Sequence, residues 1–252
     1  MIAVGKIDIG IKRTRNEDGV FISNTPIGAL PNLYIVADGM GGHKGGAVAS
    51  KLAIEAFCAY IEAHNKIKFD YEEDILNLLK RGIVHANYII YREANNHEEC
   101  KGMGTTLTLC TVINNKIYSA HVGDTRIYLV NNSHIRQMTI DHSLVQEMVE
   151  QGFILESEVK EHPQRHVITR AVGTYENIKV DTLISELEGV EYILLCSDGL
   201  TSMISNEKIQ MLIYSEQNNL NDIVERLIDA ANAEGGLDNI AVIMGKRCEV
   251  IR

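Results

Sequence analysis

Four aspartates in this sequence each lie at the edge of an apolar run with the length and composition of a buried β-strand. A single Asp-Gly pair is an ordinary turn former, so one such acid proves little. Four of them suggest one shared site, and a fold that brings four strand ends together is then required. The four are Asp38 after residues 33–37, Asp124 after residues 120–123, Asp198 after residues 193–197 and Asp238 before residues 239–243.

The hydrophobic periodicity changes twice along the chain, and it predicts the fold class. Strand patterns occur at residues 2–9, 19–23, 33–37, 106–112, 116–121, 126–131, 178–184, 191–196 and 237–244. Helical patterns occur at residues 45–60, 75–90, 144–151, 206–214 and 220–233. This order differs from a βαβα alternation and predicts an α+β fold, a four-layer α-β-β-α sandwich of two antiparallel sheets with flanking antiparallel helix pairs. The strands within residues 106–131 are expected to form an antiparallel meander.

Length and composition favour one domain. The chain has 252 residues, of which 45% are hydrophobic, and no repeat or linker is visible. We expect a single catalytic domain over residues 1–246, with a short tail at residues 247–252. Within the domain, residues 139–173 are less regular and long enough to act as a surface flap.

Charge and cysteine content exclude several classes of partner and site. The formal net charge is −10, which disfavours a nucleic-acid partner. The five cysteines are too scattered for a metal or redox pair, and disulfides are not expected. The N-terminus lacks a signal-peptide pattern and no run of eighteen apolar residues occurs, so we expect a cytoplasmic protein without a membrane partner. A monomer is the default expectation.

Carboxylates without paired His or Cys residues indicate a site for hard cations such as Mg²⁺ or Mn²⁺. Two such ions about 4 Å apart can deprotonate a bridging water and hold a phosphoryl oxygen for in-line attack. The reaction class that fits is phosphoester hydrolysis. Such a site also needs a cation for the phosphate, and Arg13, close in sequence to Glu17 and Asp18, has a guanidinium suited to bidentate binding.

Eight short motifs in this order resemble the metal-dependent serine/threonine protein phosphatases of type 2C, in their compact bacterial form. Each motif alone is weak, but together they span nearly the whole chain and are highly specific. They are Gly10-x-x-Arg13-x-x-Asn16-Glu17-Asp18, Ala37-Asp38-Gly39-Met40-Gly41-Gly42-His43, Gly102-Met103-Gly104-Thr105-Thr106-Leu107, Val122-Gly123-Asp124-Thr125-Arg126, Asp141-His142-Ser143-Leu144, Ile168-Thr169-Arg170-Ala171-Val172-Gly173, Ser197-Asp198-Gly199-Leu200 and Asp238-Asn239.

The resemblance implies a role for each matching residue. Asp38 is expected to bridge two Mn²⁺ or Mg²⁺ ions, with Asp198 and Asp238 completing one ion and the Gly39 carbonyl serving the other where the chain turns sharply. A third, weaker metal site is expected at Asp124 and Asp198. The remaining assignments are Arg13 as the phosphate-binding residue, Glu17, Asp18 and Asn239 as groups that orient metal-bound water, and Asp141, His142, Ser143 and Arg170 as residues of the flap.

The implied activity is hydrolysis of phosphoserine and phosphothreonine in proteins, by direct attack of a two-metal-bridged hydroxide and without a covalent phosphoenzyme. The expected substrates are proteins phosphorylated by a bacterial Ser/Thr kinase, with the cognate kinase itself as one candidate. Two alternatives remain: a catalytically silent module that binds phosphoproteins or a kinase, and an enzyme for small phosphoesters. A nucleotide-binding loop is disfavoured, because no Gly-Lys-Ser/Thr follows the glycines of residues 39–46.

Several of these residues also have simpler interpretations. Arg13 could pair with Glu17 on the surface, a contact of little energetic value. Asp124 could be a turn former, and either Asp141 or Ser143 could cap a helix.

Met40 marks a departure from many eukaryotic members of the family, which carry a histidine directly after the Asp-Gly as the proposed acid for the leaving alkoxide. His43 lies three residues further on, but loop histidines are more often spectators, so we expect water to protonate the leaving group. The substitution His43→Ala should therefore lower turnover less than about tenfold, measured as kcat on a phosphopeptide. A loss above about a hundredfold would overturn this assignment, since general acid catalysis contributes on that order.

Overall fold

A computed structural model describes residues 1–42, 45–215 and 219–247 of the chain. His43, to which the proton-transfer prediction applies, lies outside the described residues. The strands are β1 (Ile2–Asp8), β2 (Asp18–Ser23), β3 (Leu33–Met40), β4 (Gly104–Thr105), β5 (Leu107–Ile113), β6 (Lys116–Val122), β7 (Arg126–Val130), β8 (Ile135–Gln137), β9 (Asp181–Glu186), β10 (Tyr192–Cys196) and β11 (Ile240–Lys246). The helices are α1 (Gly45–Ala63), α2 (Glu72–Asn96), α3 (Leu144–Glu150), α4 (Asp198–Thr201), α5 (Asn206–Tyr214) and α6 (Leu220–Ala233), with 3₁₀ turns η1 (Glu98–Cys100) and η2 (Glu156–Glu161).

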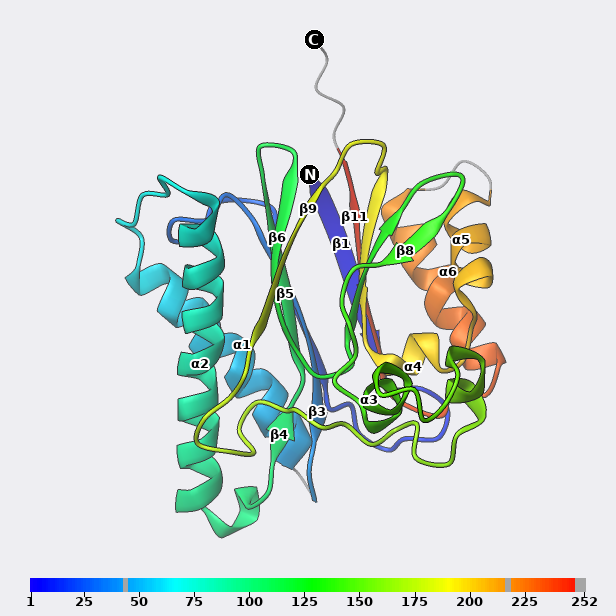
Figure 1. Cartoon of the computed structure of the whole chain (residues 1–252), viewed down its shortest axis with the longest axis horizontal. Coiled ribbons are helices and arrows are strands. Elements are labelled where there is room, and N and C mark those ends of the chain that lie inside the picture. Colours follow the sequence, from blue (N-terminus) through cyan, green and yellow to red (C-terminus); the bar gives the residue numbers. More distant parts are fainter. Residues whose placement is uncertain (43–44, 216–218, 248–252) are drawn as a thin grey trace.

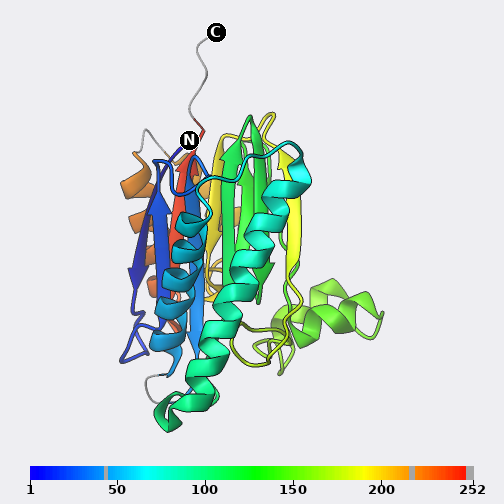
Figure 2. The same ribbon diagram turned by 90° about the vertical axis from the view of Figure 1, so that its left-hand side faces the viewer.

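The strands form two antiparallel sheets that pack face to face between two groups of helices (Figure 1). One sheet has the order β1-β11-β10-β7-β8, and the other has the order β2-β3-β5-β6-β9, with β4 paired to β3. Helices α1 and α2 cover the second sheet, whereas α5 and α6 cover the first; Figure 2 shows α1 and α2 lying over their sheet. The predicted four-layer sandwich is confirmed.

Three apolar clusters hold the layers together. The first lies between α1, α2 and the β2-containing sheet and includes Phe57 and Leu79. The second lies between α5, α6 and the β1-containing sheet. The third, which includes Tyr34 and Ile243, lies between the two sheets. Because β3 and β10 are buried on both faces, they read as continuous apolar runs, which is why the sequence indicated them clearly.

The predicted meander within residues 106–131 is wrong in its last strand. β5 and β6 do pair, through a tight turn at Asn114 and Asn115 with positive φ. β7, however, pairs with β10 in the other sheet. Since β6 and β7 are both buried almost throughout, their patterns do not reveal that the link between them crosses from one sheet to the other. Asp124 lies in that link.

The predicted sharp turn at Gly39 is also wrong. β3 continues through Asp38 to Met40, and Gly39 pairs with Thr105. Glycine is required there for space: a Cβ on Gly39 would lie 2.1 Å from the Gly46 carbonyl oxygen and 2.6 Å from that of Glu17. β3, the strand that carries Asp38, therefore packs directly against the start of α1.

Other boundaries agree to different degrees: α2 spans Glu72–Asn96, up to six residues beyond the predicted 75–90, and β9 begins three residues later than predicted. α5 and α6 have the predicted bounds, and Ser143 caps α3 by accepting a hydrogen bond from the Gln146 N–H, as one of the simpler interpretations held. The short strands β4 and β8 were not predicted, because two or three residues carry too little periodicity. No helix in the described ranges is long and apolar enough to cross a membrane.

The contact between α1 and α2 depends on Gly82, where the ring of the fully buried Phe57 fills the space that a side chain would need. A Cβ at Gly82 would lie 2.5 Å from the Phe57 ring. Alanine improves helix propensity by about 1 kcal/mol, but overpacking a core costs about 1–3 kcal/mol. We therefore expect Gly82→Ala to lower the melting temperature by a few degrees in calorimetry. Arg81→Ala, on the exposed side of α2, should leave it nearly unchanged; an increase for Gly82→Ala would contradict this packing.

Candidate active site

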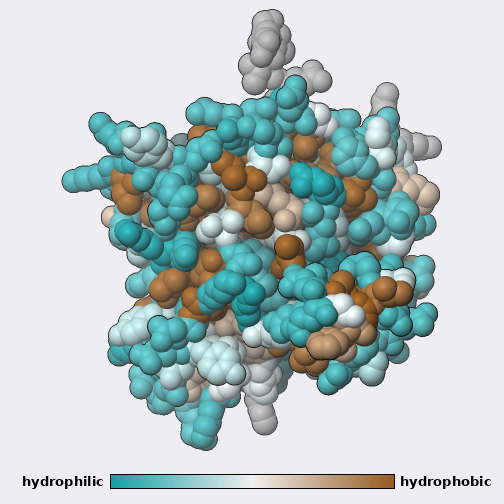
Figure 3. All heavy atoms as spheres, viewed as in Figure 1, coloured by the Kyte–Doolittle hydropathy of each residue, from teal (hydrophilic) through white to brown (hydrophobic). Residues whose placement is uncertain are grey.

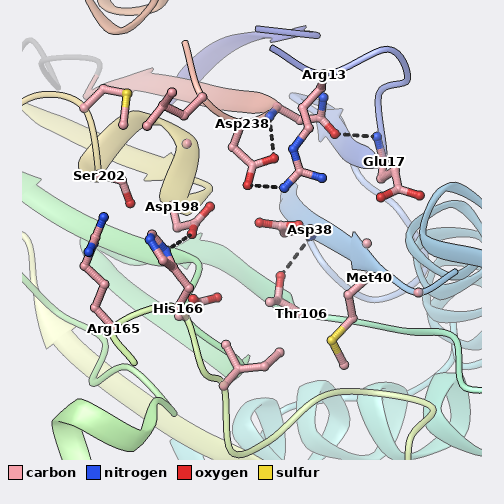
Figure 4. Close-up of a pocket in the computed structure, with 18 residues that line it drawn as sticks. Arg13, Glu17, Asp38, Met40, Thr106, Arg165, His166, Asp198, Ser202 and Asp238 are labelled. Carbon is pink, nitrogen blue, oxygen red and sulfur yellow. Dashed lines mark hydrogen bonds and ion pairs between the residues drawn. The ribbon is translucent and has the colours of Figure 1, made fainter. Parts of the chain in front are cut away.

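A pocket of about 550 Å³ opens at one end of the sandwich, where strands of both sheets and the loop before β2 meet (Figure 4). It collects residues that lie more than two hundred positions apart in the sequence. Of the predicted site residues, it is lined by Arg13, Glu17, Asp38, Gly39, Asp124, Asp198, Asp238 and Asn239.

Asp38 lies near the end of β3, directly opposite Asp18 on β2. Asp18 is buried behind the pocket, where its Oδ2 accepts a hydrogen bond of 2.7 Å from the Ser197 hydroxyl. Ser197 in turn accepts the Ala241 N–H at 2.8 Å, so this hydroxyl links β2 to the other sheet. The Asp18 side chain thus lies where the two sheets contact each other.

The carboxylates raise one another's pKa. Burial, followed by repulsion from Asp18 and Asp198, raises the pKa of Asp38 well above its usual range. Burial and the negative charge of Asp198 do the same for Asp124. The pKa of Asp18 rises to about 7, chiefly through burial. Such a concentration of partly desolvated acids is unfavourable unless cations or protons neutralise it.

Two carboxylate oxygens of this group, Asp18 Oδ1 and Asp198 Oδ1, are buried and have no hydrogen-bond partner within the described residues. An unpartnered buried oxygen is costly, and at an acidic cluster it suits a cation ligand better than a further hydrogen-bond acceptor. No group of three or more His, Cys, Asp or Glu side chains in the described part of the chain has an arrangement that could hold a metal ion by itself. Hard cations commonly use one or two carboxylates with carbonyl oxygens and water, so the residues present fit such an ion.

Arg13 extends into the pocket from the loop before β2. Its Nη2 lies 2.7 Å from Asp238 Oδ2, rather than against Glu17 as the surface-pair interpretation supposed. The Arg13 side chain as a whole is about half exposed, at 47% of its surface. The positive charge of Arg13 therefore lies beside the aspartates of the pocket, and part of the Arg13 side chain is open to the pocket.

Asn239 holds the loop that carries Arg13. Its side-chain amide donates hydrogen bonds to the carbonyl oxygens of Ile9 and Arg15, and its Oδ1 accepts the Glu17 N–H. These three bonds join residues at the two ends of the sequence. All three bonds join the carboxamide to backbone groups, so Asn239 fixes the position of the loop that carries Arg13.

The four predicted flap residues lie at the base of the segment rather than in the pocket. Asp141 accepts two hydrogen bonds from Arg126 Nε and a third, of 2.6 Å, from Nη2. His142 Nδ1 accepts the Gly123 N–H, and Asp181 lies close to both His142 Nε2 and Arg170 Nη1. The His142 carbonyl accepts the Thr169 N–H, which closes the base of the segment. The flap is thus anchored next to Asp124.

Comparison with known proteins agrees with this geometry. The family model described as protein phosphatase 2C matches residues 11–243. The chain belongs to the protein phosphatase 2C family.

Relatives of this phosphatase cover nearly its whole length. A putative protein phosphatase 2C-type of Streptococcus pyogenes is 38% identical over 241 residues, covering 95% of this chain and 94% of its own. A crystal structure of a bacterial serine phosphatase has a TM-score of 0.90 at 35% identity, covering 98% of this chain and 97% of its own. The Stp1 serine/threonine phosphatase of Staphylococcus aureus has a TM-score of 0.89 at 33% identity, covering 98% and 94%. This chain is therefore a serine/threonine protein phosphatase of a metal-dependent family.

Arg165 and His166, which reach the phosphatase pocket from the flap (Figure 4), are among the lining residues that were not predicted from the sequence. His166 Nδ1 lies 4.0 Å from Asp198 Oδ2. Both residues precede the motif that begins at Ile168, but nothing in their local pattern distinguishes them from other polar loop residues. Only their proximity to the motif could have suggested them.

The raised pKa of Asp18 makes the metal-free phosphatase less stable as pH rises. Between pH 3.8 and about 7, the folded state keeps a proton on Asp18 that the unfolded state has released, so stability falls with rising pH across this window. In a chelator, Asp18→Asn should have a higher melting temperature than wild type at pH 8, and this difference should shrink towards pH 4. The exposed Asp70→Asn makes the same charge change outside the pocket and should show no such trend. An Asp18→Asn advantage that stays constant with pH would contradict the proposed burial effect.

Proposed function

We propose that this phosphatase hydrolyses phosphoserine and phosphothreonine in proteins by direct in-line attack of water on phosphorus, without a covalent phosphoenzyme. The observation that carries the proposal is the pocket itself, in which Asp38, Asp124, Asp198 and Asp238 lie together with the Arg13 guanidinium. We further propose that residues 1–246 act as one catalytic domain, since the pocket uses residues from Arg13 to Asn239.

Divalent cations are the group that best neutralises this pocket. Asp38, Asp198, Asp238 and the Gly39 carbonyl would hold two Mn²⁺ or Mg²⁺ ions, and Asp124 with Asp198 would hold a weaker third. When bound, the ions supply Lewis-acid chemistry that activates water and neutralises charge on the phosphoryl group. The two buried, unpartnered oxygens of Asp18 and Asp198 support an ion rather than further hydrogen-bond donors.

Arg13 would bind the phosphoryl oxygens. A guanidinium offers paired N–H donors that match the geometry of phosphate, and this one already lies at the pocket wall. Among the described residues, its ion pair with Asp238 uses Nη2, which leaves the other donors to face a ligand. Its positive charge would also lower the repulsion between the incoming phosphate and the four acids.

Water as the nucleophile agrees with the position of the thiols. Of the described cysteines, Cys58, Cys100, Cys110 and Cys196, none lines the pocket. Burial also raises the pKa of the Cys196 thiol to about 12, so this side chain is a protonated part of the core.

The proposed substrates are phosphorylated proteins, with a cognate Ser/Thr kinase among them. The relatives' names support this class: one is the serine/threonine phosphatase stp of Listeria monocytogenes, 36% identical over 252 residues. The open, half-exposed position of Arg13 also suits a phosphate carried on a macromolecule better than an enclosed cavity would.

Phosphate release from a phosphothreonine peptide, with Mn²⁺ or a chelator, tests this function. We expect turnover only with metal, and Asp38→Asn should lower kcat by about a hundredfold or more, since it removes charge from the centre of the pocket. Asp70→Asn, exposed and remote from the pocket, should match wild type. Absence of turnover with Mn²⁺ would favour a silent phosphoprotein-binding module, and turnover only on small esters would favour a metabolite enzyme.

A further inference from the structure

The hydrogen-bond ladder beside Asp38 is interrupted at Thr106, which lies in the gap between β4 and β5. The pairings Val36 with Thr108 and Gly39 with Thr105 place Asp38 opposite Thr106. The Thr106 N–H donates to the Asp38 carbonyl at 2.8 Å, as in a regular antiparallel pair. The Asp38 N–H, however, donates to the Thr106 side-chain Oγ1 at 2.9 Å, as the dashed line in Figure 4 shows. A side-chain hydroxyl thus takes the place of a backbone carbonyl.

Thr105 completes this arrangement. Its hydroxyl lies 2.8 Å from the Asp38 carbonyl oxygen and 2.9 Å from the Thr106 carbonyl oxygen, the two acceptors at the break. Its backbone exchanges two hydrogen bonds with Val172, at the end of the flap segment. The backbone of Asp38 is therefore held on both its N–H and its C=O by the Thr105-Thr106 pair.

The other side of the Thr106 side chain packs against Gly123, the residue before Asp124. A Cβ at Gly123 would lie 2.5 Å from both Cβ and Cγ2 of Thr106, and Gly123 has a φ of +112°. Thr106 is 2% exposed, so its side chain is fixed between these two backbones. One threonine therefore contacts Asp38 through its hydroxyl and the link that carries Asp124 through its methyl group.

We propose that Thr106 is a positioning residue, whose hydroxyl sets the place of Asp38 while its methyl group packs against the link that carries Asp124. The proposal rests on the roles assigned to Asp38 and Asp124 under the proposed function. Valine has nearly the same shape as threonine but cannot accept the Asp38 N–H, which would be left to seek another partner. Serine keeps the acceptor and loses only the methyl group. The two substitutions separate the two contacts.

We expect Thr106→Val to lower kcat on a phosphothreonine peptide by about 10- to 100-fold, with KM changed less than about threefold. In calorimetry, Mn²⁺ binding should be weaker by about tenfold or more, because the loss of a supporting contact around a metal site has effects of this size. Thr106→Ser should restore both quantities to within about threefold of wild type, since the hydroxyl is retained. Thr111→Val is the matched control, because Thr111, on β5, is also buried, but among the described residues its hydroxyl bonds only Asn32, at 3.5 Å. It should behave like wild type at temperatures well below its melting point.

The proposal is overturned if Thr106→Val matches Thr111→Val, or if Thr106→Ser is as impaired as Thr106→Val. Should Thr106→Val fail to fold, Thr106→Ala removes the same acceptor without adding volume and is expected to show the same losses. Wild type and Asp38→Asn are measured alongside: an inactive wild type would refute the proposed function, whereas an active wild type with an unimpaired Thr106→Val refutes only the role of Thr106.

Discussion

Repulsion between desolvated carboxylates is the constraint on which the rest of this structure depends. Burial and mutual repulsion raise the pKa values of Asp38, Asp124 and Asp198, so the bare pocket is unfavourable by itself. The sandwich compensates through its apolar layers, which hold the strands in register regardless of the charge at their ends. The stability of the core thus supports a strained acidic site, as functional sites often require.

The pocket is held by contacts between distant parts of the chain. Asn239 joins the loop of Arg13 to the start of β11, and the Ser197 hydroxyl joins Asp18 to the opposite sheet. On the other side, His142 bonds to Gly123 and so anchors the flap beside Asp124. These contacts use neutral polar groups, which hold backbone and carboxylates in place without adding to the charge of the site. Apolar side chains gather at the lower right of the face shown in Figure 3. Within the flap segment, Phe153 and Leu155 are exposed.

Much of the fold followed from pattern, and the failures have physical causes. α5 and α6 were predicted to the residue, because amphipathic periodicity and their polar flanks mark both ends. The meander failed at β7, since a strand buried on both faces does not show which neighbour it pairs with. Gly39 was correctly singled out but for a different reason, namely close packing against Gly46 rather than a turn. Arg165 and His166 were missed because loop residues carry no periodicity.

The sequence alone determined the chemical inventory: which strands end in aspartate, which loop carries an arginine, and the order of motifs that marks the family. These properties depend only on which residues are present and on their spacing along the chain. Only the tertiary structure decided that Arg13 pairs with Asp238, that the link bearing Asp124 crosses between the sheets, and that the Thr106 hydroxyl replaces a backbone acceptor for Asp38. Such contacts depend on which strands become neighbours, and that choice is made by burial of the whole core rather than by any one segment.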